Sequence, residues 1–327
     1  MDGILNMVKV VGKEGISATI LADSVSSVSG KRITTFELEY PRLIHAELMT
    51  HRLFSRNAAS SRAIPIKKKI KMIWNSPAMP VHWGKNQPGM QAKAELQGFK
   101  RSLAKFAWKT ASKLACISTY ALFKLGIHKQ IVNRILEPFE RYKVVLTATE
   151  FENWFWLRDH EDAQPEIREL ARVMSKAREE SNPFELHPGE WHLPYVSTKR
   201  RDIGQHGGGS IIYKVGDEEV DLNTAQQVSA SCCAQVSYRV LNQSIEKAKD
   251  IFSKLMNSVP SHSSPTEHQA TPMKCFDNLS YIATGVDYED GITHTSLKSD
   301  MNGCDLWSGN FCGWIQYRQL IPNNVKM

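Results

Sequence analysis

The segment from Pro41 to Arg62 constrains the fold more than any other part of the chain, because a helix start runs directly into a polar loop that ends on an arginine. Pro41 suits the first turn of a helix, and Ile44, Leu48 and His51 follow at helical spacing. The groups suited to an anion come next: Ser55, Asn57, Ser60, Ser61 and Arg62. Hydroxyls, free backbone N–H groups and a guanidinium fork bind phosphate, so we predict an anion-binding corner that suits a nucleotide.

The composition is that of an ordinary soluble globular protein. With 327 residues, 42% hydrophobic and 23% charged, the chain can form one large domain or two small ones. Its net charge of +7 leaves nucleic acid, anionic metabolites and mere solubility open, and we expect the positive excess to be spread along the chain. No apolar run is long enough to cross a bilayer, and the N-terminus lacks a signal pattern, so we expect a cytoplasmic protein.

The six cysteines show no Cys-x-x-Cys spacing, which argues against a structural zinc site. They are Cys116, Cys232, Cys233, Cys275, Cys304 and Cys312. In a chain of this length we expect reduced thiols that pack as small apolar groups. Nothing near Cys232 and Cys233 in the sequence would lower a thiol pKa, so we expect them to pack rather than to act as nucleophiles.

Hydrophobic periodicity predicts an α+β chain. We expect strands in 5–40, a long loop over 63–90, helices in 91–136, a strand at 142–149 and helices from about 150 and 165. A flexible loop is expected over 183–221, helices at 223–240 and 244–258, and a strand or a strand-to-helix junction over 311–320. The lysine run from Lys67 to Lys71 is expected to be a solvated face.

The helix that begins near residue 150 is expected to carry an arginine on its apolar face. Aromatic and arginine side chains recur there at the spacing of one face: Phe151, Trp154, Phe155 and Arg158. A guanidinium in such a place needs a carboxylate or a bound anion to compensate its desolvation. Arg134 borders a similar stripe. An internal ion pair would explain either arginine alone, whereas both together with Arg62 favour a buried small anion.

These residues resemble the signature of the flavin-dependent thymidylate synthases, which is an Arg-His-Arg triplet followed by Ser, Asn and a final Ser-x-Arg. The first block reads here as Thr50-His51-Arg52, Ser55, Asn57 and Ser60-Ser61-Arg62. A second block of that family reads as Arg134, Leu136-Glu137-Pro138, Asn153, Leu157-Arg158 and Ala163-Gln-Pro-Glu-Ile167.

A third block of the family normally lies near the N-terminus and is displaced here to the C-terminal side. The stretch from Val228 to Tyr238 resembles its Ala-Arg-Val-Ser helix, and the stretch from His262 to His268 resembles its flavin-contacting His-x-Ser/Thr-Pro-Phe-Glu-His turn. We therefore expect a circularly permuted chain, which a fold tolerates when the joined ends lie close together at the surface.

The resemblance implies reductive methylation of dUMP to dTMP, in which methylene-tetrahydrofolate donates the carbon, FAD relays it with a hydride, and NADPH re-reduces the flavin. By position it implies the substrate contacts Glu47, Ser60, Ser61, Arg62, Arg134 and Arg158. Of these, Ser60 and Arg158 are the implied catalytic residues, with Ser60 contacting substrate and Arg158 polarising the uracil carbonyl. The implied FAD contacts are His51, Arg52, Asn57, Asn153, His262, Ser264 and Glu267, and no metal is implied. The loop from Lys67 to Gln87 is expected to close over substrate.

The sequence departs from the family pattern at four positions, and these departures keep two other functions open. Thr50 replaces the first arginine of the triplet, Ala58 an acidic residue and Ser61 a glycine, and Asp162 stands near an expected histidine. A flavin- and folate-dependent hydroxymethylase of dUMP or dCMP on the same scaffold is one alternative. The other is a basic, non-catalytic nucleic-acid-binding protein, which we rank lower because the lysine run is not interleaved with aromatic residues.

The fold class implied by the resemblance is α+β, with a mixed or antiparallel sheet and long helices, as in the thymidylate synthase complementing protein family. We expect a single catalytic domain over 1–327, divided into strands and the first motif (1–62), a mobile loop (63–90), a helical part with the second motif (91–182), a loop insertion (183–221) and a permuted flavin-contact segment (222–327). We also expect a homo-oligomer, a tetramer by resemblance, that binds dUMP and folate but no membrane and no nucleic acid.

Overall fold

The computed structural model describes most of the chain. The described residues are 7–201, 209–237, 244–259, 261–274, 286–287, 292–293, 307–322 and 324. Tyr238, Cys275 and Cys304 lie outside them. No helix among the described residues combines the length and the apolar character needed to cross a bilayer.

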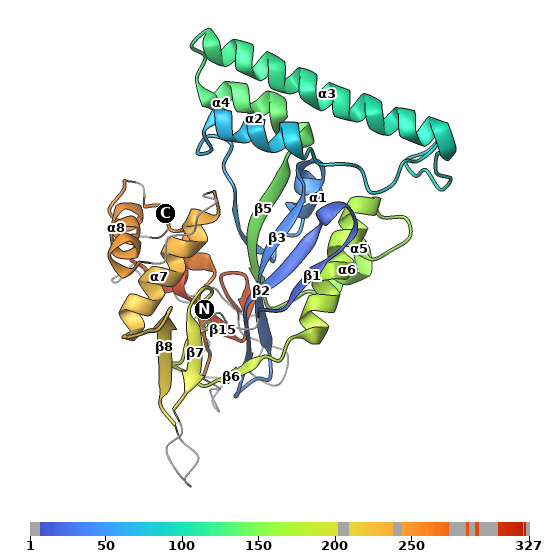
Figure 1. Ribbon diagram of the computed structural model, residues 1–327. Helices are drawn as coiled ribbons and strands as arrows, with labels where there is room; N and C mark the ends of the chain where they lie inside the picture. Colours follow the sequence, from blue (N-terminus) through green and yellow to red (C-terminus); the bar gives the residue numbers. More distant parts are fainter. Residues whose placement is uncertain are drawn as a thin grey trace.

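A six-stranded sheet forms the centre of the fold (Figure 1). Its strands are β1 Lys9–Val11, β2 Ser17–Ser26, β3 Arg32–Pro41, β4 Ser55–Ala58, β5 Arg141–Ala148 and β6 Phe184–Leu186. They follow the order β1-β2-β3-β5-β4, and β6 adds to β2. All pairs are antiparallel except that of β2 with β6. A mixed, mostly antiparallel sheet combined with helices confirms the predicted α+β class.

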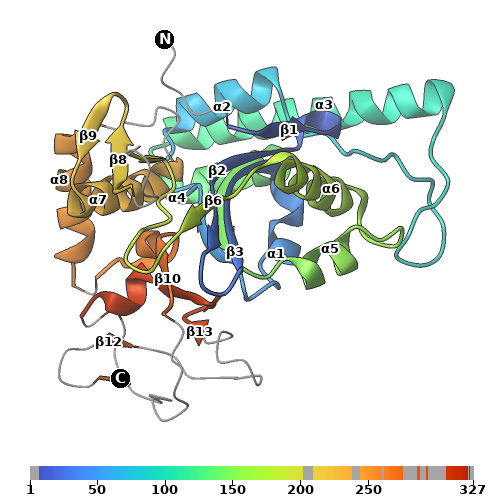
Figure 2. The same ribbon diagram turned by 90° about the horizontal axis from the view of Figure 1, so that it is seen from below.

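One face of the sheet packs on α5 (Glu152–Arg158) and α6 (Pro165–Glu180), as Figure 2 shows. Pro165 begins α6, where its missing N–H leaves no hydrogen bond unmade. Ile167, Leu170 and Met174 then lie on the buried side of the helix. The sheet contributes alternate residues to this core: Phe36, Leu38, Tyr40, Tyr142, Val144 and Leu146.

The opposite face is covered by the C-terminal half of the chain. Leu21 and Val145 of the sheet pack there against Cys233 and Val236. The covering elements are α7 (Leu222–Ala234), a 3-10 helix Gln235–Ser237, α8 (Ile245–Met256) and the sheet of β7 (Ser197–Arg200), β8 (Ile211–Val215) and β9 (Glu218–Val220). The remaining elements are the 3-10 helices Lys13–Gly15, Ser264–Glu267 and Tyr317–Leu320 and the short strands β10 Ala270–Pro272, β11 Val286–Asp287, β12 Ile292–Thr293, β13 Trp307–Ser308, β14 Phe311–Cys312 and β15 Trp314–Gln316.

A buried chain of hydrogen bonds joins this C-terminal half to the sheet. His192 bonds Ser24 of β2 at 2.9 Å and Thr35 of β3 at 2.8 Å. Thr35 bonds its cross-strand neighbour Thr147 at 2.7 Å, and Thr147 bonds His268 at 2.8 Å. None of the five side chains is more than 5% exposed. The sheet supplies the hydroxyls and the C-terminal half supplies both histidines, so neither part satisfies this network alone.

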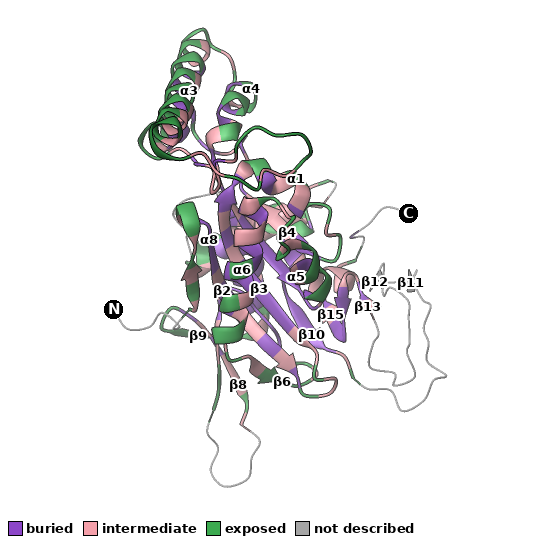
Figure 3. Cartoon of the chain, turned by 90° about the vertical axis from the view of Figure 1, so that its right-hand side faces the viewer, coloured by how far each residue is buried: buried purple, intermediate pink, exposed green. Residues whose placement is uncertain are grey.

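A helical layer lies across the end of the sheet where β5 begins (Figure 1). It consists of α2 (Ile66–Asn75), α3 (Gly98–Lys124), α4 (Lys129–Val132) and the 3-10 helix Asn133–Phe139. Ile73, Cys116 and Leu136 form its small core. The 3-10 helix Arg42–Ile44 and α1 (His45–Leu48) instead pack in the main core through Ile44 and Leu48. The outer side of α3 is largely exposed (Figure 3) and carries a row of large apolar side chains: Phe99, Leu103, Phe106, Leu114 and Ile117.

The positive charge is concentrated in this layer, which corrects the expectation that it is spread along the chain. Residues 63–136 hold fourteen of the 41 lysines and arginines but only one, Glu95, of the 34 acidic residues. The rest of the chain is therefore net acidic. An anion approaching the protein meets a strongly positive region over α2 and α3.

Most predicted elements are confirmed, and two segments expected to be loops are not. The segment 63–90 contains α2, because Ile66, Ile70 and Ile73 give that stretch a helical apolar face. Pro65 precedes the first turn, and the other prolines of the segment come after Asn75. The segment 183–221 contains four strands rather than a flexible loop. There Gly216, with a φ of +61°, turns β8 into β9, a two-residue hairpin signal that the sequence carried.

The two buried histidines should make the protein less stable in acid. Burial lowers the pKa of His192 and of His268 from 6.5 to about 3. As the pH falls, the unfolded chain therefore binds protons on these histidines that the folded chain does not bind. Their contribution to the free energy of unfolding is fully present above pH 6.5 and is lost as the pH falls towards 3. Each histidine adds at most about 1.4 kcal/mol per pH unit to this slope.

Unfolding free energies measured in urea from about pH 7 to about pH 4 test this expectation. His192→Gln should flatten the slope, and the same change at the exposed His160 should leave it as it is. Equal slopes for the two variants would contradict a neutral buried histidine.

Candidate functional site

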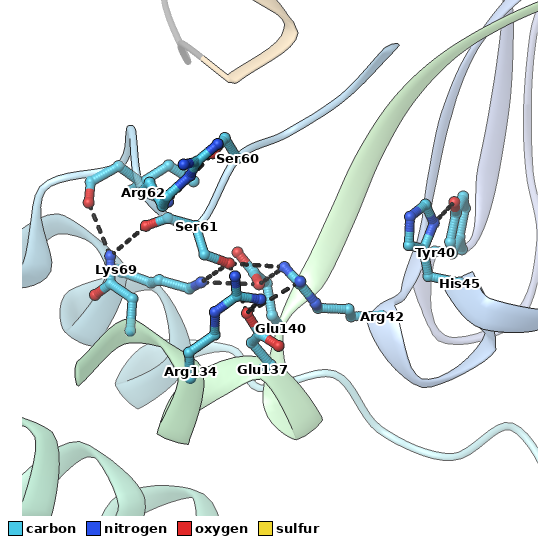
Figure 4. Close-up of polar contacts among 12 residues, drawn as sticks. Tyr40, Arg42, His45, Ser60, Ser61, Arg62, Lys69, Arg134, Glu137 and Glu140 are labelled. Carbon is cyan, nitrogen blue, oxygen red and sulfur yellow. Dashed lines mark hydrogen bonds and ion pairs between the residues drawn. The ribbon is translucent and has the colours of Figure 1, made fainter. Parts of the chain in front are cut away.

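The corner after β4 is built on a buried ion pair (Figure 4). Lys69 of α2 and Glu140 are 0% and 2% exposed, and the Lys69 Nζ lies 2.9 Å from a Glu140 carboxylate oxygen. Arg42 lies 3.2 Å from Glu140 and 3.0 Å from Glu137. The Ser61 hydroxyl accepts hydrogen bonds from Arg42 at 2.8 Å and from Lys69 at 3.2 Å, and donates to Glu137 at 2.8 Å. The backbone of the corner is thus fixed by paired charges under the surface.

The burial of Lys69 overturns the expectation that the whole lysine run is a solvated face. Lys69 lies on the apolar side of α2, three residues after Ile66 and four before Ile73. Desolvation lowers the pKa of its ammonium, and the negative charge of Glu140 opposes this change. The helical spacing of the isoleucines was the sequence signal that could have found it.

The outer residues of the corner face solvent, which corrects the expectation of inward-facing arginines. Arg62 is exposed, and its guanidinium has no hydrogen bond or ion pair with any residue that the structure describes. Ser60 lies beside it and accepts a hydrogen bond from the Arg62 backbone N–H at 3.3 Å. The Arg134 side chain is 57% exposed and pairs with Glu137 at 3.0 Å. Arg134 therefore has an ion-pair partner at the surface and is not buried.

Arg158 belongs to a second group, at the ends of α1 and α5. Its Nη1 lies 3.3 Å from a Glu47 carboxylate oxygen, its Nη2 donates to the Thr50 hydroxyl at 3.3 Å, and its Nε donates to His51 Nε2 at 3.0 Å. The side chain remains 22% exposed. Arg158 thus has an internal partner in Glu47, and its guanidinium is still open to solvent on one side.

His51 is held neutral in this second group. Burial lowers its pKa to about 4, and the positive charges of Arg158 and Arg56 act in the same direction. Its ring stacks on Phe54 and meets the edge of Trp154, at centroid distances of 5.7 Å and 4.7 Å. Because Nε2 accepts the bond from Arg158, the proton of the neutral ring belongs on Nδ1.

The segments that resemble the third block lie against the first block. Asn57 of β4 donates to the carbonyl of Cys233 in α7 at 3.4 Å, although the two residues are 176 positions apart. Gln316 of β15 donates to the Ser55 hydroxyl and to the Glu267 carbonyl, each at 3.1 Å. Strand β4 and the 3-10 helix Ser264–Glu267 are therefore joined through β15.

The other predicted flavin contacts are mostly exposed. Glu267 forms an ion pair with Arg318. The remaining four make no side-chain hydrogen bond or ion pair with the described part of the chain: Arg52, Asn153, His262 and Ser264. The structure does not bring these four together by any contact of their own.

Sequence reasoning missed two arginines that shape the site. Arg42 pairs with both carboxylates of the corner. Arg56 donates to the carbonyls of Leu48, Met49 and His51, and so closes the end of α1. Neither arginine lies in an apolar stripe or at a motif position, so no local pattern marked them.

Comparison with known proteins places the chain in a family. The sequence model of the thymidylate synthase complementing proteins matches residues 9–184, which is more than half of the chain. The chain belongs to this family. A search of curated proteins found no match. Among solved structures, the chain is similar to a UMP/dUMP methylase, PolB from Streptomyces cacaoi bound with 5-Br dUMP, with 19% identity, a TM-score of 0.37, and coverage of 45% of this chain and 66% of that chain.

The match of this thymidylate synthase complementing protein ends at β6, so α7 and the displaced third block lie outside it. Within α7, burial raises the pKa of Cys232 to about 12 and that of Cys233 well above its usual value. Both thiols are buried and free. This confirms that they pack in the helix, because a thiol with such a pKa does not supply a thiolate nucleophile.

The donors around β4 suit the flavin that the family resemblance implied. Buried within the third block, His268 Nε2 is a polar ring atom with no partner among the described residues. Arg52, His262 and Ser264 offer further donors at the surface. A guanidinium, an imidazole and a hydroxyl are groups that hold phosphate and ring edges, so the residues present fit a flavin nucleotide.

Removing the buried lysine should destabilise the protein strongly. Lys69→Met leaves Glu140 buried with only Arg42 as its partner, and the loss of one member of a buried pair destabilises a protein by about 3 kcal/mol. The matched control is Lys68→Met on the exposed side of the same helix, which should change stability by less than about 0.5 kcal/mol. Urea midpoints measure both variants, and equal midpoints would show that the pair does not hold the corner.

Proposed function

We propose that this protein is a flavin-dependent thymidylate synthase that methylates dUMP to dTMP, with methylene-tetrahydrofolate as carbon donor and NADPH as reductant. The observation that carries the proposal is the family match over the two groups of motif residues, the Ser60–Arg62 corner and the Arg158 group. Both present cationic or hydroxyl donors to solvent, as a dianionic nucleotide requires.

The corner would hold the nucleotide phosphate. Arg62 has a free guanidinium, and Ser60 lies next to it, so both can turn to an incoming dianion. Arg134 lies near the corner, because it and Ser61 both contact the carboxylate of Glu137. The buried charges beneath keep the Ser61 backbone in place while the exposed groups bind, which limits the entropy lost on binding.

Arg158 would meet the uracil ring. Glu47, Thr50 and His51 hold its guanidinium from one side, so its remaining N–H groups can donate to a carbonyl oxygen of the base. A donor fixed before the reaction stabilises charge that develops on that oxygen. Because His51 is neutral, it accepts a hydrogen bond from Arg158 and adds no second positive charge beside it.

The cofactor would lie on the β4 side of the site. When bound, reduced FAD supplies hydride and relays the one-carbon unit, which no side chain of the chain can do. Arg52, Asn57, Asn153, His262, Ser264 and Glu267 are the residues we assign to holding it. Glu267 is fixed by Arg318 and Asn57 by α7, whereas the exposed donors are available to a ligand.

The proposal includes assembly into a homo-oligomer, with a tetramer expected from the family resemblance and each chain forming one catalytic domain. In the described residues, Ser61 and Arg134 share no hydrogen bond or ion pair with Glu47 and Arg158. A second copy can bring one group against the other. The apolar row on α3 offers a surface for such contact, with Phe99 79% and Phe106 67% exposed.

A visible absorbance spectrum followed by product analysis tests the proposed reaction. The protein loaded with FAD should show flavin bands that dUMP perturbs, and the product formed with methylene-tetrahydrofolate and NADPH should have the mass of dTMP. Arg62→Ala should weaken dUMP binding roughly tenfold or more, by the usual worth of a charged hydrogen bond, while Lys176→Ala on α6 should not. A hydroxymethyl product would replace the methylation proposal with the hydroxymethylase alternative. A protein that takes up no flavin but is retarded on DNA would favour nucleic-acid binding.

Disruption of the α3 row should dissociate the assembly. Leu103→Glu with Phe106→Glu places two charges in the exposed apolar row, and we expect a shift to monomer in light scattering because a desolvated carboxylate opposes an apolar contact. The control is Lys176→Glu on α6, which is exposed and changes the net charge by the same two units. An unchanged mass for the double variant would place the contact elsewhere.

A further inference from the structure

The helices α2 and α3 lie side by side and run in opposite directions (Figures 1 and 2). Two contacts fix how they are paired. The Cys116 thiol donates to the carbonyl of Ile70 at 3.8 Å, and the Lys113 ammonium lies 5.5 Å from the centre of the Trp74 ring. A later residue of α2 thus meets an earlier residue of α3, and the two helices form an antiparallel pair.

Each helix presents exposed lysine and aromatic side chains where the two helices meet. On α2 these are two turns apart on one face: Lys67 and Trp74. On α3 they recur at the spacing of one face: Lys109, Lys113, Tyr120 and Lys124. We call these six residues the lysine-aromatic seam. It borders the apolar row of α3 on the side towards α2.

The antiparallel pairing sets each ring of the seam level with a lysine of the other helix. Trp74 is level with Lys113, as their contact shows. By the same pairing, Lys67, one turn before Ile70, is level with Tyr120, one turn after Cys116. Both rings remain accessible, with Trp74 44% and Tyr120 45% exposed.

No carboxylate balances the charge of the seam. Glu95 is the one acidic residue of the segment 63–136, and it pairs with Arg101 at 3.2 Å. Among the residues that the structure describes, none of the four seam lysines forms an ion pair. Lys113 and Lys124 instead lie over the rings of Trp74 and Tyr120, each at 5.5 Å. The seam is therefore a strip of uncompensated positive charge with two exposed rings set into it.

Only the fold interleaves these lysines with aromatic rings. In the sequence, the run from Lys67 to Lys71 contains no aromatic residue, and for that reason we ranked nucleic-acid binding low. In the structure, α3 lies beside that run and supplies Tyr120, while its Lys113 meets Trp74. Cations that follow a phosphate backbone, combined with rings that stack on bases, are typical of surfaces that bind single strands.

We propose that the lysine-aromatic seam binds single-stranded nucleic acid. Its lysines contact phosphates, and Trp74 and Tyr120 stack on unpaired bases. Bases alternate with phosphates along a strand as the rings alternate with lysines along the seam, which the surface of a membrane does not match. From Lys109 to Lys124 the seam is about 22 Å long at 1.5 Å per residue, enough for a few nucleotides.

The chemistry of the seam indicates what kind of strand it takes. A duplex keeps its bases stacked inside, so it offers the two rings no partner. The cations are all lysines, which contact phosphate as point charges and do not grip a base edge with two parallel hydrogen bonds, so we expect no sequence preference. The proposal does not depend on the reaction proposed above, because no residue of the seam belongs to either motif group.

Fluorescence anisotropy of the full-length protein with a labelled oligo(dT), an oligo(U) of equal length and a DNA duplex tests the seam. The single strands should bind more tightly than the duplex. Their affinity should fall with salt, with a slope of about −2.8 in a double-logarithmic plot for four phosphate contacts. An excess of dUMP should not displace them, because the seam is separate from the proposed dUMP site.

Two kinds of variant separate the charges from the rings. Lys109→Gln with Lys113→Gln should weaken binding and reduce the size of the salt slope by about 1.4, because two phosphate contacts are lost. Trp74→Ala should weaken binding roughly tenfold at an unchanged slope, because a stacked ring carries no charge. All three positions are exposed, so folding should be retained, as circular dichroism can verify.

The controls change the same residue types outside the helical layer. Lys9→Gln with Lys199→Gln removes two exposed lysines, and Trp156→Ala removes a ring that is 75% exposed on α5. Both should bind single strands as the unchanged protein does. All variants should keep flavin bands that dUMP perturbs, which distinguishes failure of the seam from failure of the proposed reaction.

Single-strand binding that the seam variants weaken and the controls do not supports the proposal, and the tighter of oligo(dT) and oligo(U) identifies the nucleic acid. Equal losses in seam and control variants overturn it, because general attraction would then explain the binding. It is also overturned if the duplex binds as tightly as the single strands, or if dUMP displaces them. Absence of oligonucleotide binding at low salt overturns it too, and sedimentation with vesicles of phosphatidylcholine and phosphatidylglycerol would then assign the seam to a membrane surface.

Discussion

The need to neutralise one buried ammonium group organises the candidate site. Lys69 lies on the apolar side of a helix, and a charge there is stable only with partners at close range. Glu140 meets this need at the start of β5, Arg42 balances Glu140, and Ser61 bonds to both cations. A single ion pair therefore fixes α2, the corner and the sheet relative to one another. The exposed Arg62 and the partly buried Ser60 beside it depend on this support.

The departure from the family pattern at Thr50 has a physical account in this structure. The Thr50 hydroxyl accepts a hydrogen bond from Arg158 at 3.3 Å, within the group that includes Glu47 and His51. An arginine at position 50 would place a second cation against Arg158, with one carboxylate to balance both. The hydroxyl avoids that repulsion and still engages the guanidinium. Nothing in the structure explains Ala58 in the same way.

The C-terminal half is held on the sheet by hydrogen bonds between buried polar groups as well as by apolar packing. The two histidines of that half form hydrogen bonds with a row of sheet hydroxyls. Because their pKa values are low, they stay neutral at neutral pH, and this contact between the two parts is weakened in acid. The same docking brings α7 and the turn before His268 to β4. The segments that resemble the flavin contacts thus lie against the first motif in the fold although they are distant from it in the sequence. They are outside the region that the family match covers.

The sequence alone determined the features that depend on local periodicity and on contiguous motifs. These are the α+β class, the strands before Pro41, the helix begun by Pro165 and the family, because alternation, helical spacing and a run of motif residues are written in neighbouring positions. Only the tertiary structure decided which charges are paired. Arg134 lies in solvent, Lys69 lies inside, and Arg158 meets Glu47, because each outcome depends on an element that folds against the residue from a distant part of the chain.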